Sequence, residues 1–291
     1  MDDPSALSAA RKASRVYLLL VLGLCYGLGA LELIFRTGTF YQILAKGFTA
    51  IPVAAAFLAR RLTGVNWEYN LSLRAWKNGK AWLFSAFVPA ILIGCGAVIY
   101  YLIFREQYSG VCRYGALFGS PASVEVKSPL LFLLVCVLIS AAVVPLQLLE
   151  LGEEIGWRQY LLGFQVRRYG SRKAVLINGA EWGLAHLPLI YFGFNYSLDN
   201  MGAPWSNMAL MMLVCMVLGV IMSYITIKTR NCMYAAIIHG AVNVIAEIPV
   251  CLSYTMKNGL LGPNPTGLVT LLPLIVLSAV LFRIMPEAER P

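Results

Sequence analysis

Three charged side chains lie close together at the end of a long apolar run. The segment LGEEIGWRQYLL at 151–162 contains two adjacent glutamates and an arginine, and a charge at membrane depth costs about 2.5 to 3.5 kcal/mol. Residues four apart share a helix face, whereas adjacent residues diverge by about 100°. We therefore expect Glu154 to pair with Arg158 as a structural ion pair. Glu153 is left as a carboxylate without a local counterion, which suits a general base.

The chain has only two histidines, and both lie in apolar runs: His186 in WGLAH and His239 in HGAVN. An imidazole beside a carboxylate is the usual pair for proton transfer near neutral pH. His239 and Asn243 share a helix face and could both donate to one oxygen, as in an oxyanion site. A polar pair that mediates helix packing is the alternative interpretation. The nearest basic residues mark the cytoplasmic edge of the membrane. At about 1.5 Å per helical residue from that edge, Glu153, His186 and His239 lie at roughly equal depth, so their side chains could meet.

Three other ionisable residues lie in apolar runs, and none of them is assigned to the chemistry. Glu32 and Lys46 are expected to extend toward the interface or to pair helices. Glu181 precedes His186 by about one turn. It could tune that histidine or pair with Arg158, and the sequence does not separate these two roles.

The composition is that of a membrane protein. Of 291 residues, 59% are hydrophobic and 13% are charged, and the mean hydropathy is +0.71. A helical span needs about 20 residues, and only helices satisfy the backbone in lipid without forming a barrel. We therefore predict an all-α fold of about eight transmembrane helices, near 16–35, 39–59, 81–104, 129–152, 174–195, 205–227, 233–255 and 266–284. The first run is too long for a signal peptide and is expected to be retained.

The basic residues predict the orientation of the chain. With the N-terminus in the cytoplasm, seventeen of the 23 Lys and Arg residues fall on the cytoplasmic side and five on the other, with Lys46 inside a span. This asymmetry follows the positive-inside rule for eight spans with both termini cytoplasmic. The net charge of +9 therefore reflects topology and a lipid bilayer partner, and we expect no nucleic-acid partner.

No feature of the sequence divides the chain into separate domains. It has no internal repeat, low-complexity tract or long linker, so we expect a single membrane domain over 1–291. The seven cysteines are scattered singly without a C-x-x-C pair, which favours buried thiols over a disulfide framework or metal finger.

Three motifs, taken in order, resemble the CPBP family of intramembrane proteases, also called the CAAX-protease and bacteriocin-processing (Abi) family, which includes the type II CAAX prenyl endopeptidases. They are EEIGWR at 153–158, WGLAH at 182–186 and HGAVN at 239–243. The resemblance covers roughly 129–250 and leaves 1–128 without a motif match. One departure is Gln159, where the family often has a glycine.

The resemblance implies roles for the motif residues. Glu153 and His186 would activate a water, His239 and Asn243 would hold the oxyanion, and Glu154 and Arg158 would support the site. The catalytic cavity would lie among the spans near 129–152, 174–195, 205–227 and 233–255 and would open toward the cytoplasm.

We therefore expect an intramembrane endopeptidase that cleaves a membrane-associated protein or peptide, a prenylated CAAX C-terminus being one option. A metal-free mechanism without a cofactor is favoured because no H-E-x-x-H is present. The alternative is a zinc enzyme in which Glu153, His186 and His239 bind the metal. A different alternative is a proton-coupled transporter, but it would need inverted repeats, which the sequence lacks. A non-catalytic scaffold or immunity protein is the third alternative.

Overall fold

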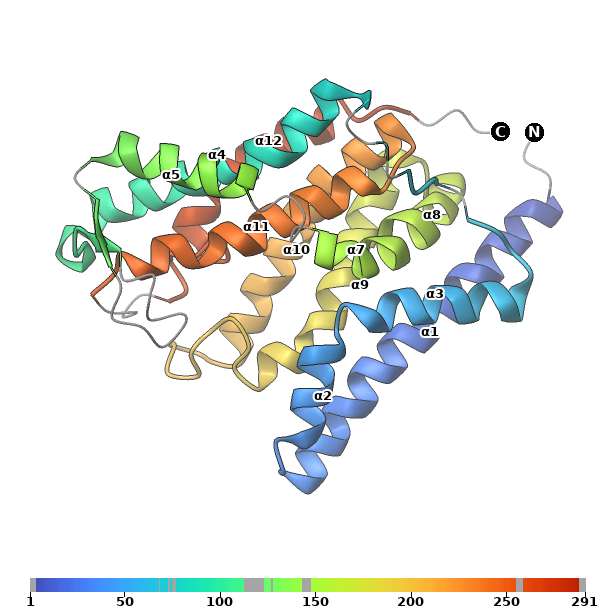
Figure 1. The fold of residues 1–291 in the computed structure, drawn as a ribbon. Coiled ribbons are helices and arrows are strands. Elements are labelled where there is room, and N and C mark those ends of the chain that lie inside the picture. Colours follow the sequence, from blue (N-terminus) through green and yellow to red (C-terminus); the bar gives the residue numbers. More distant parts are fainter. Residues whose placement is uncertain are drawn as a thin grey trace.

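The structure, a computed structural model, is almost entirely helical and describes residues 4–67, 69–72, 74, 77–112, 123–126, 128–142, 148–254 and 259–287. Figure 1 shows the helices as a bundle in which elongated helices flank a central group. The elements are α1 (Pro4–Phe35), α2 (Thr39–Gly47), α3 (Ala50–Thr63), α4 (Gly79–Ile103), the 3-10 turn η2 (Arg105–Gln107), the antiparallel strands β1 (Val111–Cys112) and β2 (Val124–Glu125), α5 (Pro129–Ala142), the 3-10 turn η4 (Leu148–Glu150), α7 (Leu151–Glu154), η5 (Ile155–Leu161), α8 (Leu162–Tyr169), α9 (Ser171–Tyr191), α10 (Trp205–Thr229), α11 (Met233–Cys251) and α12 (Leu268–Arg283).

The helices confirm an all-α integral membrane protein. Within the described residues, four helices are long and apolar enough to cross a bilayer, namely α1, α4, α10 and α11, and the pair α2 and α3 makes a fifth if counted as one span. The apolar helix α12 has 16 residues, somewhat fewer than the usual span length. The expected count of eight spans stays a prediction.

The expected span near 39–59 is divided. It forms α2 and α3, whose axes differ by 72°. The break follows from the sequence, because Gly47 ends α2 and Pro52 lies in the first turn of α3, where its missing N–H costs nothing. As a consequence Phe48, which follows α2, points into the molecule and is buried.

The expected span near 129–152 is also not one continuous helix. Helix α5 ends at Ala142, residues 143–147 lie outside the described residues, and the chain continues through η4 and the four-residue helix α7. The next seven residues, Ile155–Leu161, form a π-helix. Such segments often occur at functional sites, and this one contains Arg158.

Small residues allow α9 and α10 to pack closely, as Figure 1 indicates by their adjacent courses. A Cβ built on Gly219 would lie 2.9 Å from the Cα of Gly179, and one on Gly179 would lie 2.9 Å from the Cα of Met216. Backbones approach in this way when glycines line a membrane helix interface. Because α9 carries His186, the close pairing fixes the position of that histidine.

A second glycine pair holds the EEIGWR segment against the N-terminal helices. A Cβ on Gly152 would clash with the carbonyl oxygen of Thr49, and one on Gly156 would lie 2.5 Å from the Tyr17 hydroxyl and 2.6 Å from Cβ of Pro52. The glycines thus let α7 and η5 rest on α1 and on the start of α3.

We expect Gly156→Ala to lower the free energy of unfolding by about 1 to 3 kcal/mol, because the added methyl overpacks a filled interface. The measurement is the thermal midpoint of the purified protein in detergent. The matched control is Gly27→Ala, since a Cβ at Gly27 has no atom within 4 Å. Equal midpoints for the two variants would contradict the packing described for Gly156.

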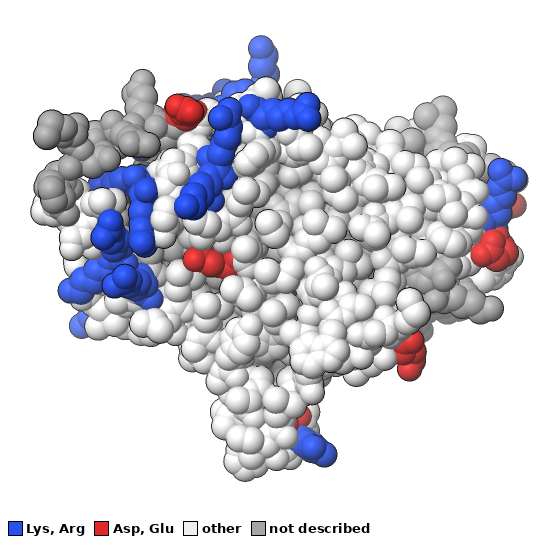
Figure 2. All heavy atoms as spheres, turned by 180° about the vertical axis from the view of Figure 1, so that it is seen from behind, with Lys and Arg blue, Asp and Glu red and all other residues white. Residues whose placement is uncertain are grey.

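Positive charge is unevenly distributed over the surface. Figure 2 shows Lys and Arg side chains gathered toward one end of the visible face, with few at the opposite end. The Nη2 of Arg172 donates to the carbonyl oxygen of Arg283 at 3.1 Å, which joins the start of α9 to the end of α12. The distribution agrees with the asymmetry expected from the sequence, while the orientation of the termini in the membrane stays a prediction.

Candidate active site

Glu154 connects two of the three motifs. Its Oε1 accepts a hydrogen bond from Nη1 of Arg158 at 3.1 Å and another from Nδ1 of His239 at 2.9 Å. The side chains of Glu154 and Arg158 are both 0% exposed. The expected pair four residues apart is therefore present, and it also orients a histidine that lies 85 positions further along the chain.

Glu153 points away from this pair, as the helix spacing predicts. It is buried, and its Oε2 accepts a hydrogen bond from the indole Nε1 of Trp182 at 2.8 Å. Among the described residues, no Lys or Arg forms an ion pair with Glu153. Within the part of the chain that the structure describes, its one hydrogen bond comes from this neutral donor, so the carboxylate is held in place without a Lys or Arg beside it.

Trp182 contacts residues of all three motifs, although from the sequence it was only the first residue of the WGLAH motif. The Cζ of Arg158 lies 4.4 Å from the centre of the indole ring. The rings of His186 and His239 each stand edge to face with the indole at 5.3 Å. The signal that could have found this role is the i, i+4 spacing of Trp182 and His186 on one helix.

His186 is fixed by its own helix and by the break between α2 and α3. Its Nδ1 donates to the carbonyl oxygen of Trp182 at 2.9 Å, which leaves Nε2 as the ring nitrogen able to accept a proton. The ring of Phe48 packs at 4.5 Å, and Sγ of Cys215 lies 3.7 Å from Nδ1. The N-terminal helices, which carry no motif, thus contribute a wall of the site.

Glu150 is a residue near the site to which sequence reasoning gave no role. Its Oε2 lies 3.9 Å from Nε2 of His239, and its side chain is 15% exposed. Single atoms of Glu150, Glu153 and His239 lie within 4.8 Å of one another. Two carboxylates and an imidazole form a ligand set that zinc accepts, with Nε2 as the available nitrogen because Glu154 holds Nδ1. This trio of described residues differs from the expected alternative set, in which His186 takes the place of Glu150.

Asn243 lies one turn after His239 on α11 and is exposed. Among the described residues its side chain has no hydrogen-bond partner. The shared face follows from the helix, and the joint role with His239 in binding an oxyanion stays a prediction.

Two carboxylates outside the centre have structural partners. Glu181 accepts a hydrogen bond from Nε2 of Gln165 at 2.5 Å, so α8 provides a partner for it that neither sequence interpretation anticipated. Glu32 accepts hydrogen bonds from the backbone N–H groups of Gly38 at 2.7 Å, Phe40 at 3.1 Å and Tyr41 at 3.2 Å. It therefore caps the start of α2 and joins α1 to α2, which agrees with the expected helix-pairing role and not with the extension toward the interface.

Gln159 also has a structural place. Its backbone carbonyl accepts from the N–H of Tyr69 at 3.4 Å, and its side chain is buried. The position where the family often has a glycine therefore helps to anchor the segment that follows α3.

The motif region is similar to a known family. Residues 127–245 match the family described as type II CAAX prenyl endopeptidase Rce1-like. This match contains all three motifs and confirms the predicted resemblance, while residues 1–126 lie outside it.

A relative named as a CAAX prenyl protease is also similar to part of this chain. The CAAX prenyl protease 2 of Methanococcus maripaludis is 30% identical over 99 residues, which are 33% of this chain and 36% of that protein. The chain therefore matches about a third of the length of this relative.

Proposed function

We propose that this chain is an intramembrane endopeptidase of the CAAX-protease type that hydrolyses a peptide bond in a membrane-associated protein or peptide. The observation that carries the proposal is the environment of Glu153. This buried carboxylate is held by an indole N–H, forms no ion pair with a Lys or Arg among the described residues, and shares Trp182 with both histidines. The similarity of residues 127–245 to the Rce1-like family supports the same activity.

In the proposed reaction, Glu153 takes a proton from a water molecule whose oxygen attacks the scissile carbonyl carbon. His186 assists by accepting a hydrogen bond from that water at Nε2. A carbon–oxygen bond forms and the carbonyl π bond breaks, so negative charge develops on the carbonyl oxygen. The proton held by Glu153 then passes to the leaving nitrogen as the carbon–nitrogen bond breaks.

His239 and Asn243 are assigned to the developing oxyanion. With both ring nitrogens protonated, Nδ1 of His239 donates to Glu154 and Nε2 is left to donate to the substrate oxygen. The amide of Asn243 supplies a second donor from the next turn of α11. Glu154 acts through His239 and is therefore a positioning residue.

The substrate is to be found by comparing protein termini. Membranes from cells that express either the native chain or Glu153→Gln are digested, and peptides that carry new termini are identified by mass spectrometry. Termini present only with the native chain support hydrolysis and identify the substrate. If the two sets of termini agree and the variant keeps every cellular phenotype of the native chain, the non-catalytic scaffold is favoured instead.

We expect hydrolysis to survive exhaustive chelation. The donor set of Glu150, Glu153 and His239 fits zinc chemically, and a zinc bound there would polarise the carbonyl and the attacking water. The glutamate mechanism needs only groups that the chain itself supplies. The measurement is the cleavage rate after treatment with a strong chelator and dialysis. Loss of activity that zinc alone restores would overturn the metal-free mechanism.

A further inference from the structure

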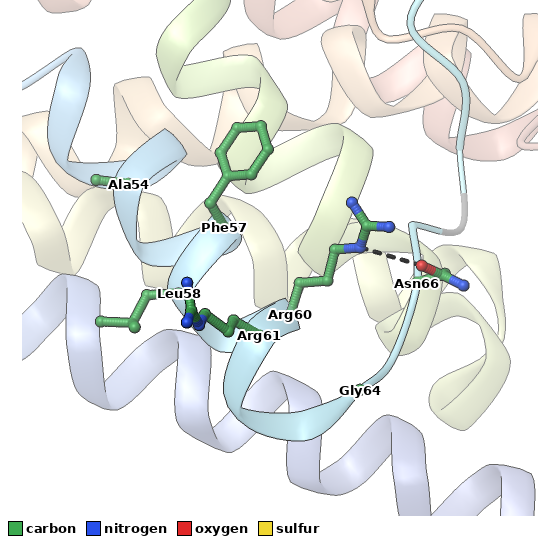
Figure 3. Close-up of a pocket in the computed structure, with 7 residues that line it drawn as sticks. All are labelled: Ala54, Phe57, Leu58, Arg60, Arg61, Gly64 and Asn66. Carbon is green, nitrogen blue, oxygen red and sulfur yellow. Dashed lines mark hydrogen bonds between the residues drawn. The ribbon is translucent and has the colours of Figure 1, made fainter.

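The last turn of helix α3 contains two adjacent arginines beside an open pocket of about 720 Å³. Figure 3 shows residues that line it, with Arg60 and Arg61 extending from the last turn of the helix. No acidic residue is among the residues that line this pocket. A pocket with two positive charges of this kind is suited to an anion.

The arginines stand above an apolar stripe. Ala54, Phe57 and Leu58 lie one to two turns earlier on α3 and line the same pocket, and spacing of three or four residues places them on the face of Arg61. Phe57 and Leu58 are 56% and 44% exposed. The pocket therefore combines a cationic end with an exposed apolar wall along α3, which with α2 makes a fifth span if the pair is counted as one.

Arg60 is held in a defined position. Its Nε donates to Oδ1 of Asn66 at 3.0 Å, and its Cζ lies 5.4 Å from the centre of the Trp67 ring. These contacts leave both terminal nitrogens of the guanidinium available for a ligand. A planar guanidinium that is already oriented loses little conformational freedom when it binds a phosphate group.

We propose that this pocket binds an anionic phospholipid, with the phosphate at the oriented guanidinium of Arg60, with Arg61 adding positive charge to the same pocket, and with an acyl chain along Phe57 and Leu58. Charge complementarity selects the anionic headgroup, and the apolar stripe selects a lipid over a free anion. Trp67, which packs against Phe57 and Arg60, is a residue type typical of the bilayer interface.

The pocket is connected to the active site by aromatic packing. Trp67 contacts Phe57 at 5.1 Å and Tyr160 at 5.4 Å between ring centres, and Tyr160 lies in the π-helix that carries Arg158. A lipid that orders the end of α3 therefore stabilises the segment on which the site is built.

The test measures thermal stabilisation of the full chain in detergent by added phosphatidylglycerol. We expect phosphatidylglycerol to raise the thermal midpoint of the native protein. In the Arg60→Gln/Arg61→Gln variant, the affinity for phosphatidylglycerol should fall about 25-fold, because each charge near the surface contributes about 1 kcal/mol of binding free energy. The matched control is Arg11→Gln/Lys12→Gln, an exposed adjacent pair on α1, which should respond like the native chain.

Two further arms distinguish the ligand sources. Phosphatidylcholine and glycerol 1-phosphate should each leave the midpoint unchanged. Equal stabilisation by phosphatidylcholine would show that headgroup charge is not recognised, and equal stabilisation by glycerol 1-phosphate would show a site for a free anion. Either result, or an undiminished response of the Arg60→Gln/Arg61→Gln variant, would overturn the proposal.

Discussion

Replacing Glu153 by glutamine is expected to slow peptide hydrolysis by about 10²- to 10⁴-fold, the usual contribution of a general base, while the protein stays folded. The glutamine has nearly the same size, and its amide oxygen can still accept the hydrogen bond from Nε1 of Trp182. It cannot take a proton from water near neutral pH. The measurement is the initial rate of cleavage of the identified substrate by purified protein, together with the thermal midpoint of each variant.

Two other variants make this result specific. Glu247→Gln removes an exposed carboxylate from α11 and should leave the rate unchanged. Trp182→Phe keeps an aromatic ring beside Arg158 but removes the N–H that holds Glu153, so we expect a smaller loss of about tenfold to a hundredfold. If Glu153→Gln kept more than half of the native rate, Glu153 would not be the base.

Local spacing predicted the part of the site that lies within one turn of helix. The four-residue interval between Glu154 and Arg158 was sufficient to predict their contact, and the adjacency of Glu153 was sufficient to predict that it faces elsewhere. The third partner of this group, His239, comes from α11. The sequence indicated only that its depth was similar, because nothing local determines which helix faces which.

The π-helix could not be predicted for the same reason, and the spacing of Trp182 and His186 on one helix indicates only part of the role of Trp182. A π-helix depends on packing that local spacing does not reveal, and this one packs closely at Gly156 against Tyr17 and Pro52. The central position of Trp182 in the site follows from its contacts with Arg158, His186 and His239. These residues belong to η5, α9 and α11, and local spacing does not bring these three elements together.

The number of spans was hard to predict where helices carry polar groups. Helix α9 has 21 residues but is not among the helices that qualify as spans. Its sequence includes Lys173, Asn178, Glu181 and His186, which lower its mean hydropathy. Polar groups needed for a buried site thus weaken the apolar signal by which a span is identified.

Arg158→Met is expected to lower the free energy of unfolding by about 3 to 5 kcal/mol, because it removes the permanently charged partner of the buried Glu154 carboxylate. Arg158 and Glu154 are both 0% exposed, so water cannot replace the lost contact. The substitution also removes the guanidinium that lies 4.4 Å from the centre of the Trp182 ring. The measurement is the unfolding midpoint in detergent, with exposed Arg168→Met as the control, for which we expect a change within about 0.5 kcal/mol.

The double variant Arg158→Met/Glu154→Gln separates an unpaired charge from a simple loss of packing. Neutralising Glu154 removes the buried charge that Arg158→Met leaves behind, so the double variant should be more stable than Arg158→Met alone. Residues that share an ion pair usually show coupling of about 0.5 to 3 kcal/mol in such a cycle. If the two effects simply added, the stability of this region would depend on the packing of the Arg158 side chain and not on its charge. Glu154 would then orient His239 without needing the arginine.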